Sequence, residues 1–486
     1  MQYMGLAILI PCIAKHCIPK MNTDRFKNYK DDVKQLVLDF ESMEKHGDCR
    51  YFDVDQLETI IDFYLDTADG EMMEKSILYG EKLFPSSTEI RLRRVHLLCF
   101  KEKYREAFKL LKQLEQVEPE NTDTLYALGV VYSALSQPRK AIQYYHKAAA
   151  DGYELGTIFS NIADEYVKME QLGDARNYYR KALRVNPDDE HALYELANCY
   201  EDDGLTDNWI HYYNRFVEEH PYSKVAWFCL GEAFIAEGLY EKAVNAYQYA
   251  ITIDADYYYA YTQLASCYAS MEDYQNAIST LHDAVDHTED KAYVYYRIAE
   301  IFKHINNLVT ANIYYRKAVH EDPFYAEAWH SLAICYSMSH SHDAAIDAAK
   351  RALKIDPESP VFLTTMALVY AESGDSENAE RFFDCATPYY TDFEQGWLAY
   401  AEFLISQQRF DDAIDILNRG LPECEMVVEF NKRLALCYFV TNRRNMLFNA
   451  VRACLLDGEE GARDLIEYVP EITSDIDVMN IIDSHN

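Results

Sequence analysis

Positive charge is scarce in this chain. Lysine and arginine together number 46 among 486 residues, against 81 aspartates and glutamates, which leaves a formal charge of −35. Such an excess of negative charge repels phosphate groups, so DNA, RNA and bare anionic membranes are poor partners. A basic partner, or a neutral one held by aromatic contacts, is favoured instead.

Long apolar runs are missing too. The most apolar segment, Met4 to Ala14, is shorter than the roughly 18 residues that a membrane-spanning helix needs. It has no preceding lysine or arginine and no clear small-residue cleavage site. Three interpretations of the apolar extension 1–20 stay open: a reading frame whose true start is Met21, a frayed apolar arm, or an export signal.

Motifs of catalysis are absent as well. The chain contains no phosphate-cradling glycine loop, no H-E-x-x-H and no G-x-S-x-G. We therefore expect no enzyme activity, no cofactor and no metal. One alternative remains, because His340, His342 and Asp343 crowd a single turn, with His330 nearby. Three such side chains could seat a metal, although residues of this kind lie more often in a solvated turn.

The cysteines do not form a disulfide pattern. Cys199, Cys267, Cys335 and Cys437 are separated by 68, 68 and 102 residues, all multiples of 34. If every 34 residues add one structural unit, these sulfurs lie far beyond the roughly 7 Å between Cα atoms that a disulfide allows. We expect buried, reduced thiols and a cytoplasm-like compartment.

A period of 34 residues organises the chain. With Thr122 as position 1, ten successive units end near residue 461. Position 8 is glycine or alanine in all ten units, and position 20 is alanine in eight of them. Position 11 is tyrosine or phenylalanine in nine units. Positions 4, 7, 8 and 11 line one face of a helix, and positions 20, 24 and 27 line a second helix. Each unit is therefore predicted to be a helix pair whose small residues permit close packing.

These residues resemble the tetratricopeptide repeat family, whose pattern is W-x2-L-G-x2-Y…A…F…A…P. The unit that begins at Lys224 carries most of it in Trp227, Leu230, Gly231, Phe234, Ala243, Tyr247 and Ala250, and departs from it at Ala255. The resemblance implies an all-α, right-handed superhelical solenoid of about twelve helix-turn-helix repeats. The opening YFDVDQLETIIDFYLD resembles bacterial cytoplasmic proteins of this type, for which no activity is implied.

We expect four segments along the chain. Residues 1–20 are the apolar extension, and 21–53 contain a leading helix (23–46) and a connector. The repeat array extends over 54–461 as twelve units, and 462–486 form capping helices around Pro470. No low-complexity linker marks a second domain.

The unit that begins at Glu190 breaks the pattern. Its position 20 is Trp209 instead of alanine, and Gly204 lies among turn-favouring residues. An indole between two close helices must push them apart or turn outward, so we expect a local irregularity here.

By the family resemblance, positions 2, 5, 9 and 12 of the first helices line a concave groove. The candidate partner-binding residues are Tyr126, Asp164, Tyr194, Asn198, Phe228, Glu232, Tyr259, Tyr293, Tyr296 and Glu300. Aromatic rings interleaved with carboxylates suit a protein or peptide that carries basic or aromatic side chains. We expect Tyr194, Phe228 and Tyr296 to be free of helix packing, so that their replacement by alanine leaves stability nearly unchanged.

Chaperone-binding members of the family clamp a terminal carboxylate with lysine at position 5 and asparagine at position 9. Asn198 stands at position 9, but Tyr194 occupies position 5 of that unit. Lys432 stands at position 5, but Leu436 follows at position 9. No unit has the pair, so a role as a chaperone-tail receptor is not indicated. The favoured function is a cytoplasmic scaffold or adaptor that binds a protein or peptide. The alternative is an exported, periplasmic component of envelope assembly, directed by the apolar extension.

Overall fold

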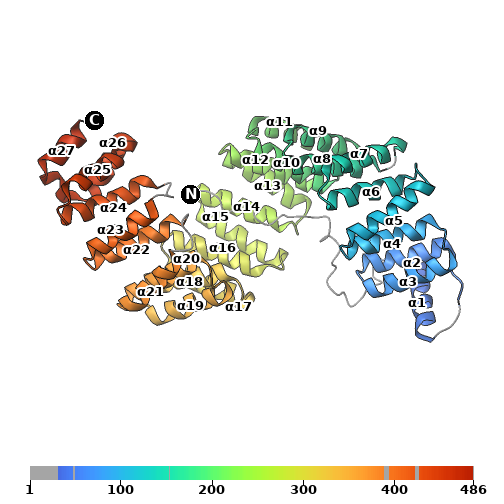
Figure 1. Cartoon of the computed structure of the whole chain (residues 1–486), viewed down its shortest axis with the longest axis horizontal. Coiled ribbons are helices and arrows are strands. Elements are labelled where there is room, and N and C mark those ends of the chain that lie inside the picture. Colours follow the sequence, from blue (N-terminus) through green and yellow to red (C-terminus); the bar gives the residue numbers. More distant parts are fainter. Residues whose placement is uncertain (1–30, 47–49, 153, 388–392, 422–425, 485–486) are drawn as a thin grey trace. The chain divides into compact units, whose positions relative to one another are not determined.

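The computed structural model describes residues 31–46, 50–152, 154–387, 393–421 and 426–484. Throughout these ranges the regular elements are helices, and no strand occurs. The all-α repeat fold expected from the sequence is confirmed (Figure 1). The apolar extension 1–20 and the first part of the expected leading helix lie outside the described residues.

Twelve helix pairs follow one another in the described part of the chain. The first helices of the pairs are α2 Val54–Asp66, α4 Thr88–Phe100, α6 Thr122–Ala134, α8 Leu155–Lys168, α10 Glu190–Asp202, α12 Lys224–Ala236, α14 Tyr258–Ser270, α16 Lys291–His304, α18 Ala326–Met338, α20 Pro360–Glu372, α22 Glu394–Ser406 and α24 Val427–Val440. The second helices are α3 Gly70–Leu83, α5 Tyr104–Val117, α7 Pro138–Ala148, α9 Leu172–Val185, α11 Thr206–Glu219, α13 Tyr240–Ile253, α15 Tyr274–Ala284, α17 Leu308–Glu321, α19 His342–Ile355, α21 Ser376–Ala386, α23 Phe410–Gly420 and α25 Arg444–Cys454. Each first helix begins within one residue of the 34-residue register.

Further helices flank the pairs. Helix α1, Asp31–His46, precedes them, and α26, Gly458–Tyr468, the short 3₁₀ helix Pro470–Ser474 and α27, Ile476–Asp483, follow them. The assignment of 54–461 to the repeat array and of 462–486 to a cap stays a prediction. No helix in the described ranges combines the length and the apolar character that a membrane crossing requires.

The helices form two compact units. The first contains α1–α13 and the second contains α14–α27, with the division after Ile253. Within each unit, most consecutive first helices approach one another, as α10 does with α8 and α12, and α20 does with α18 and α22. Consecutive second helices make no comparable approach among the described residues. The first helices therefore form the inner layer of each unit, and we call its exposed side the first-helix face.

Small residues at position 8 allow the two helices of a pair to pack closely, as expected. A Cβ atom added to Gly129 would lie 2.5 Å from the ring of Tyr145, and one added to Gly231 would lie 2.5 Å from the ring of Tyr247. Both rings are buried at position 24. The absence of a side chain at position 8 therefore makes room for a large ring from the second helix.

The turn inside every pair has one shared backbone feature. Position 15 has a positive φ in all twelve pairs, at Ala68, Glu102, Ser136, Glu170, Gly204, Gly238, Glu272, Asn306, His340, Gly374, Gln408 and Asn442. Glycine, which adopts this left-handed conformation without steric cost, occupies only three of the twelve positions. The sequence does not reveal the feature, because the other nine positions carry ordinary side chains.

The expected irregularity around Trp209 is present, but Gly204 is not part of it. Trp209 is buried, and α10 and α11 come close to each other at fewer places than the helices of the other eleven pairs described. The indole thus separates the two helices instead of turning outward. Gly204 lies at position 15, where the left-handed turn favours glycine, so its interpretation as a weak point was wrong.

The four cysteines spaced by multiples of 34 are buried free thiols, as expected. Burial raises the pKa of Cys199 and Cys437 to about 12 and that of Cys335 to about 11. These groups are therefore protonated at neutral pH and act as small core residues.

Candidate partner-binding face

All ten candidate residues lie on first helices. Tyr126 is on α6, Asp164 on α8, Tyr194 and Asn198 on α10, and Phe228 and Glu232 on α12, all in the first unit. Tyr259 on α14 and Tyr293, Tyr296 and Glu300 on α16 belong to the second unit. The structure thus brings together six candidates in one unit and four in the other, on the first-helix face of each.

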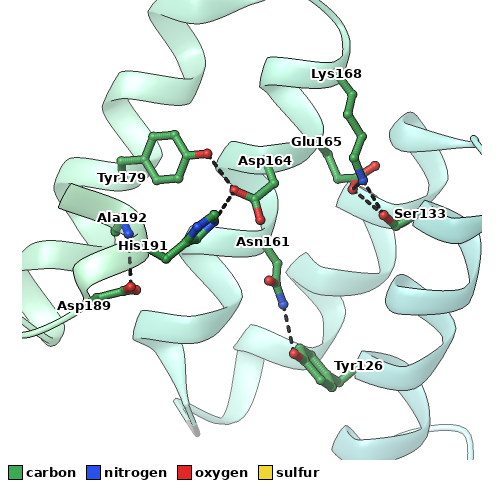
Figure 2. A network of polar contacts seen from close by, with 10 residues as sticks. All are labelled: Tyr126, Ser133, Asn161, Asp164, Glu165, Lys168, Tyr179, Asp189, His191 and Ala192. Carbon is green, nitrogen blue, oxygen red and sulfur yellow. Dashed lines mark hydrogen bonds and ion pairs between the residues drawn. The ribbon is translucent and has the colours of Figure 1, made fainter. Parts of the chain in front are cut away.

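A polar network connects α8 to its neighbours (Figure 2). The carboxylate of Asp164 accepts a hydrogen bond from the hydroxyl of Tyr179 at 2.6 Å and lies 3.0 Å from Nε2 of His191. The hydrogen bond to Asp164 is the main cause that raises the pKa of His191 above its ordinary value. On the same helix, Asn161 donates to the hydroxyl of Tyr126 at 2.9 Å. Asp164 is therefore held in a defined orientation by two neighbouring helices.

The next residue, Glu165, faces the other way in Figure 2. It is buried, and its Oε1 atom accepts from Oγ of Ser133 and from Nζ of Lys168, each at 2.6 Å. In other units position 10 is apolar or cysteine, for example Val131 and Cys199. The buried carboxylate of Glu165 was not predicted, because position 10 is not one of the face-lining positions.

The bond between Tyr179 and Asp164 recurs along the chain. The hydroxyl of Tyr247 donates to Glu232, and that of Tyr315 donates to Glu300. In every case the tyrosine stands at position 24 and the carboxylate at position 9 of the same pair, 15 residues apart. Desolvation by burial, together with the adjacent carboxylate, raises the pKa of Tyr179 and Tyr315 well above the ordinary value, so both remain donors.

This recurrence was visible in the sequence but was not recognised. Position 24 was assigned to the core and position 9 to the groove, and the two were not considered as a pair. The arrangement places one oriented carboxylate on every second first helix from α8 to α16. Position 9 differs in the intervening helices, where it is Asn198 in α10 and Ser266 in α14.

The candidate aromatic side chains pack against other rings more than expected. The ring centroid of Phe228 lies 6.0 Å from that of Tyr194 and 5.6 Å from that of buried Tyr247. Tyr296 has centroid distances of 6.0 Å to Tyr315 and 5.2 Å to Tyr325. The expectation that these rings are free of helix packing was therefore wrong. Their replacement by alanine would remove contacts of the fold as well as of the face.

Tyr259 is the most exposed of the candidate aromatics. Tyr259 is 53% exposed, and its ring centroid lies 4.1 Å from that of Tyr258. Tyr293 is half-buried, and its hydroxyl accepts from Nη1 of Arg297 at 2.8 Å. Tyr259 is therefore the ring whose removal least affects the core.

Basic groups also lie among the first helices of the second unit. Arg297 donates to Oγ of Ser266 at 2.7 Å, and Nζ of Lys303 lies 2.9 and 2.8 Å from the two oxygens of Glu300. Neither Arg297 nor Lys303 was among the residues predicted from the sequence. The negative charge of the Glu300 carboxylate is therefore already compensated in part by Lys303.

The histidine turn does not gather metal ligands. Among the described residues, no group of three histidine, cysteine, aspartate or glutamate side chains is arranged to hold a metal ion. His340 is the left-handed residue of its turn, with a φ of 55°, and its ring centroid lies 6.2 Å from that of His342. Burial lowers the pKa of nearby His330 to about 4, and its Nδ1 atom lies 3.3 Å from Oγ1 of Thr365.

Models of the tetratricopeptide repeat match four stretches of the chain: residues 124–155, 161–224, 234–301 and 311–360. The TPR repeat-containing protein YpiA of Bacillus subtilis (strain 168) is 26% identical over 106 residues, which are 22% of this chain and 25% of that protein. The match thus spans a quarter of the relative's length.

Two solved structures are similar to parts of the chain. The APC/C hetero-tetramer Cut9-Hcn1 is 14% identical, covers 84% of this chain and 93% of its own, and has a TM-score of 0.39. YrrB, described as a TPR protein with an unusual peptide-binding site, is 18% identical, covers 39% of this chain and 97% of its own, and has a TM-score of 0.32. Because repeat models match from residue 124 to residue 360 and the helix pairs keep the 34-residue register, the chain belongs to the tetratricopeptide repeat family.

Proposed function

We propose that this protein is a scaffold or adaptor of the bacterial cytoplasm. It binds a protein or peptide segment along the first-helix face, and the segment supplies basic and aromatic side chains. The compartment is proposed on the buried free thiols at Cys199, Cys267, Cys335 and Cys437, which suit a reducing environment.

The recurring bond between tyrosine and carboxylate is the observation that carries the proposal. A carboxylate has about four acceptor sites, so the tyrosine hydroxyl, together with His191 at Asp164 and Lys303 at Glu300, leaves capacity for a lysine or arginine of the partner. Because the hydroxyl also holds the carboxylate in place, less conformational entropy is lost when the partner binds. Asp164 and Glu232 repeat this arrangement in the first unit, and Glu300 repeats it in the second.

The aromatic side chains supply the second part of the recognition. Large rings carry most of the binding free energy at protein interfaces, whereas charges at the edge mainly set the association rate and the salt dependence. Tyr259 on α14, with about half of its side chain exposed, offers such a ring, and half-buried Tyr293 on α16 offers another.

An array of 15-residue peptides that vary in charge and aromatic content tests the proposal. We expect the wild type to retain peptides that combine arginine or lysine with tyrosine, tryptophan or phenylalanine. A variant with Tyr259→Ala, Glu232→Gln and Glu300→Gln should lose them, because glutamine still accepts the tyrosine hydrogen bond but carries no charge.

The matched control changes the same charge elsewhere. Glu241 and Glu377 are exposed at position 18 of the second helices α13 and α21, so Glu241→Gln with Glu377→Gln should leave peptide retention unchanged. Equal retention of basic aromatic peptides by the wild type and the first-helix variant would refute the proposal.

A further inference from the structure

The outer side of α17 is unusual among the second helices. It carries a stripe of exposed residues, and we call this stripe the α17 face: Val309, Ile313, Arg316, Lys317, His320 and, in the turn that follows, Phe324. The side chains of Val309, Ile313 and Phe324 are 76%, 52% and 79% exposed. The spacing of 309, 313, 316 and 320 places these residues on one side of the helix.

The apolar part of the stripe has no counterpart in the other repeats. Val309 and Ile313 occupy positions 18 and 22 of their unit. In the other eleven units these two positions carry polar or charged residues or glycine, such as Gln275 and Ser279 in α15 or Asp343 and Asp347 in α19. Packing of the repeat therefore does not require an apolar residue at either position.

The basic part of the stripe recurs at the same positions of α9 (Arg180, Lys181, Arg184) and α19 (Lys350, Arg351, Lys354), so α17 differs from these helices in combining it with exposed apolar residues. Arg316, Lys317 and His320 form no ion pair with any residue that the structure describes, whereas Lys303 on α16 is paired with Glu300. These three residues line a shallow hollow together with Ile313 and Glu321 of α17 and Tyr295 of α16. Cations near the end of a helix favour its dipole, but this effect does not explain the exposed valine and isoleucine beside them.

We infer that the α17 face is a docking site for an acidic peptide segment that carries at least one large apolar side chain. Carboxylates of the segment meet Arg316, Lys317 and His320, and its apolar side chain covers Val309 and Ile313. Nucleic acid fits less well, because phosphates gain nothing from the apolar residues and are repelled by the overall charge of −35. This site is separate from the first-helix face and does not depend on the function proposed for it.

A display library of random 16-residue peptides, selected on the full-length protein, tests the chemistry of the segment. We expect the selected peptides to be rich in aspartate and glutamate around leucine, isoleucine, phenylalanine or tryptophan. The strongest peptide is then synthesised with a fluorescent label, and its affinity is measured by anisotropy. A double substitution, Val309→Ser with Ile313→Ser, should weaken binding about tenfold or more, because it removes the apolar anchor from exposed positions that tolerate polar residues elsewhere.

The charge is tested with a matched pair of substitutions. Nζ of Lys317 lies 4.5 Å from the ring centroid of Tyr314, and Nζ of Lys147 on α7 lies 4.6 Å from that of Tyr144, both at position 26 of their units. Lys317→Glu should weaken binding of the acidic peptide about tenfold, whereas Lys147→Glu should change it less than about twofold. The Glu232→Gln, Glu300→Gln variant should bind the acidic peptide like the wild type, which separates this site from the first-helix face.

Three results would overturn the inference. One is a selection that yields no acidic, apolar peptides, and another is an acidic peptide whose affinity is the same for the wild type, the serine double variant and Lys317→Glu. The third is a wild-type dimer in sedimentation velocity that the serine double variant abolishes, because the α17 face would then bind a second copy of the chain.

Discussion

Replacement of Gly231 by alanine tests the close packing inside a repeat. An alanine Cβ at this position would lie 2.5, 2.7 and 2.9 Å from three carbons of the Tyr247 ring, about 1 Å inside ordinary contact. The ring cannot retreat easily, because it is fully buried and its hydroxyl donates to Glu232. Overpacking of this size costs about 1–3 kcal/mol. The lower backbone entropy of alanine offsets up to about 1 kcal/mol of that. We expect a net loss of about 0–3 kcal/mol of unfolding free energy.

A second background decides whether the ring is the cause. Alanine at position 8 occurs with leucine at position 24 in the chain itself, as Ala265 and Leu281. In a Tyr247→Leu background, Gly231→Ala should therefore stabilise the protein by up to about 1 kcal/mol. The reversal of sign gives a coupling of about 1–3 kcal/mol between the two positions.

Urea unfolding followed by circular dichroism gives the stability difference. Hydrogen exchange of α12 and α13 localises it, since a repeat array need not unfold in one step. Gly173→Ala is the control, because the nearest atom to its added Cβ is Nη2 of Arg176 at 3.8 Å, and it should be neutral or stabilising. If Gly231→Ala stabilises the protein equally with tyrosine and with leucine at position 247, the packing argument is refuted.

Three further predictions concern other parts of the repeats. The turn requires a positive φ at position 15, so Gly204→Ala should destabilise the protein by about 1–2 kcal/mol in urea unfolding. For the same reason, Gln408→Gly should leave the stability unchanged or raise it by up to about 1 kcal/mol. A loss of stability with both substitutions would contradict this reason. Trp209→Ala should lower the unfolding free energy by about 3–5 kcal/mol, because it leaves a cavity between α10 and α11. Trp209→Phe should lower it less, in part because the buried Nε1 atom of Trp209 has no hydrogen-bond partner among the described residues to lose. Equal losses in urea unfolding would count against this account. The pKa of His330 is about 4 in the folded protein and about 6.5 in the unfolded chain, so its contribution to stability is present above pH 6.5 and is lost as the pH falls toward 4. The urea midpoints at pH 7 and pH 5 should therefore differ less for His330→Gln than for the wild type. An equal difference would show that His330 does not titrate in this way.

The repeat architecture was predictable because it depends on side-chain size at fixed spacing. Alanine or glycine at position 8 recurs in ten consecutive units, so the periodicity predicted the starts of the first helices to within one residue. The left-handed turn at position 15 was not predictable in the same way. Residues such as Glu170 and Gln408 have no side-chain property that indicates a positive φ, and the neighbouring helices impose it.

The candidate face was predictable only in outline. The family resemblance indicated first-helix residues, but it could not show that the rings of Phe228 and Tyr296 contact buried tyrosines of the second helices. Those contacts depend on which rotamer each ring adopts between two helices. Arg297 was not predicted, because the residue that accepts its hydrogen bond, Ser266, lies 31 residues earlier in the sequence. Contacts between repeats of this kind do not follow from the periodicity alone.

The most direct test of partner binding on the first-helix face is hydrogen exchange in the presence of a bound peptide. The basic aromatic peptide that the array ranks highest is added to the full-length protein at saturation, and exchange is followed by mass spectrometry. We expect protection to be concentrated in first helices such as α8, α12 and α16, and the Tyr259→Ala, Glu232→Gln, Glu300→Gln variant should lose that protection. Protection confined to second helices, or protection that persists in the variant, would contradict a binding site on the first-helix face.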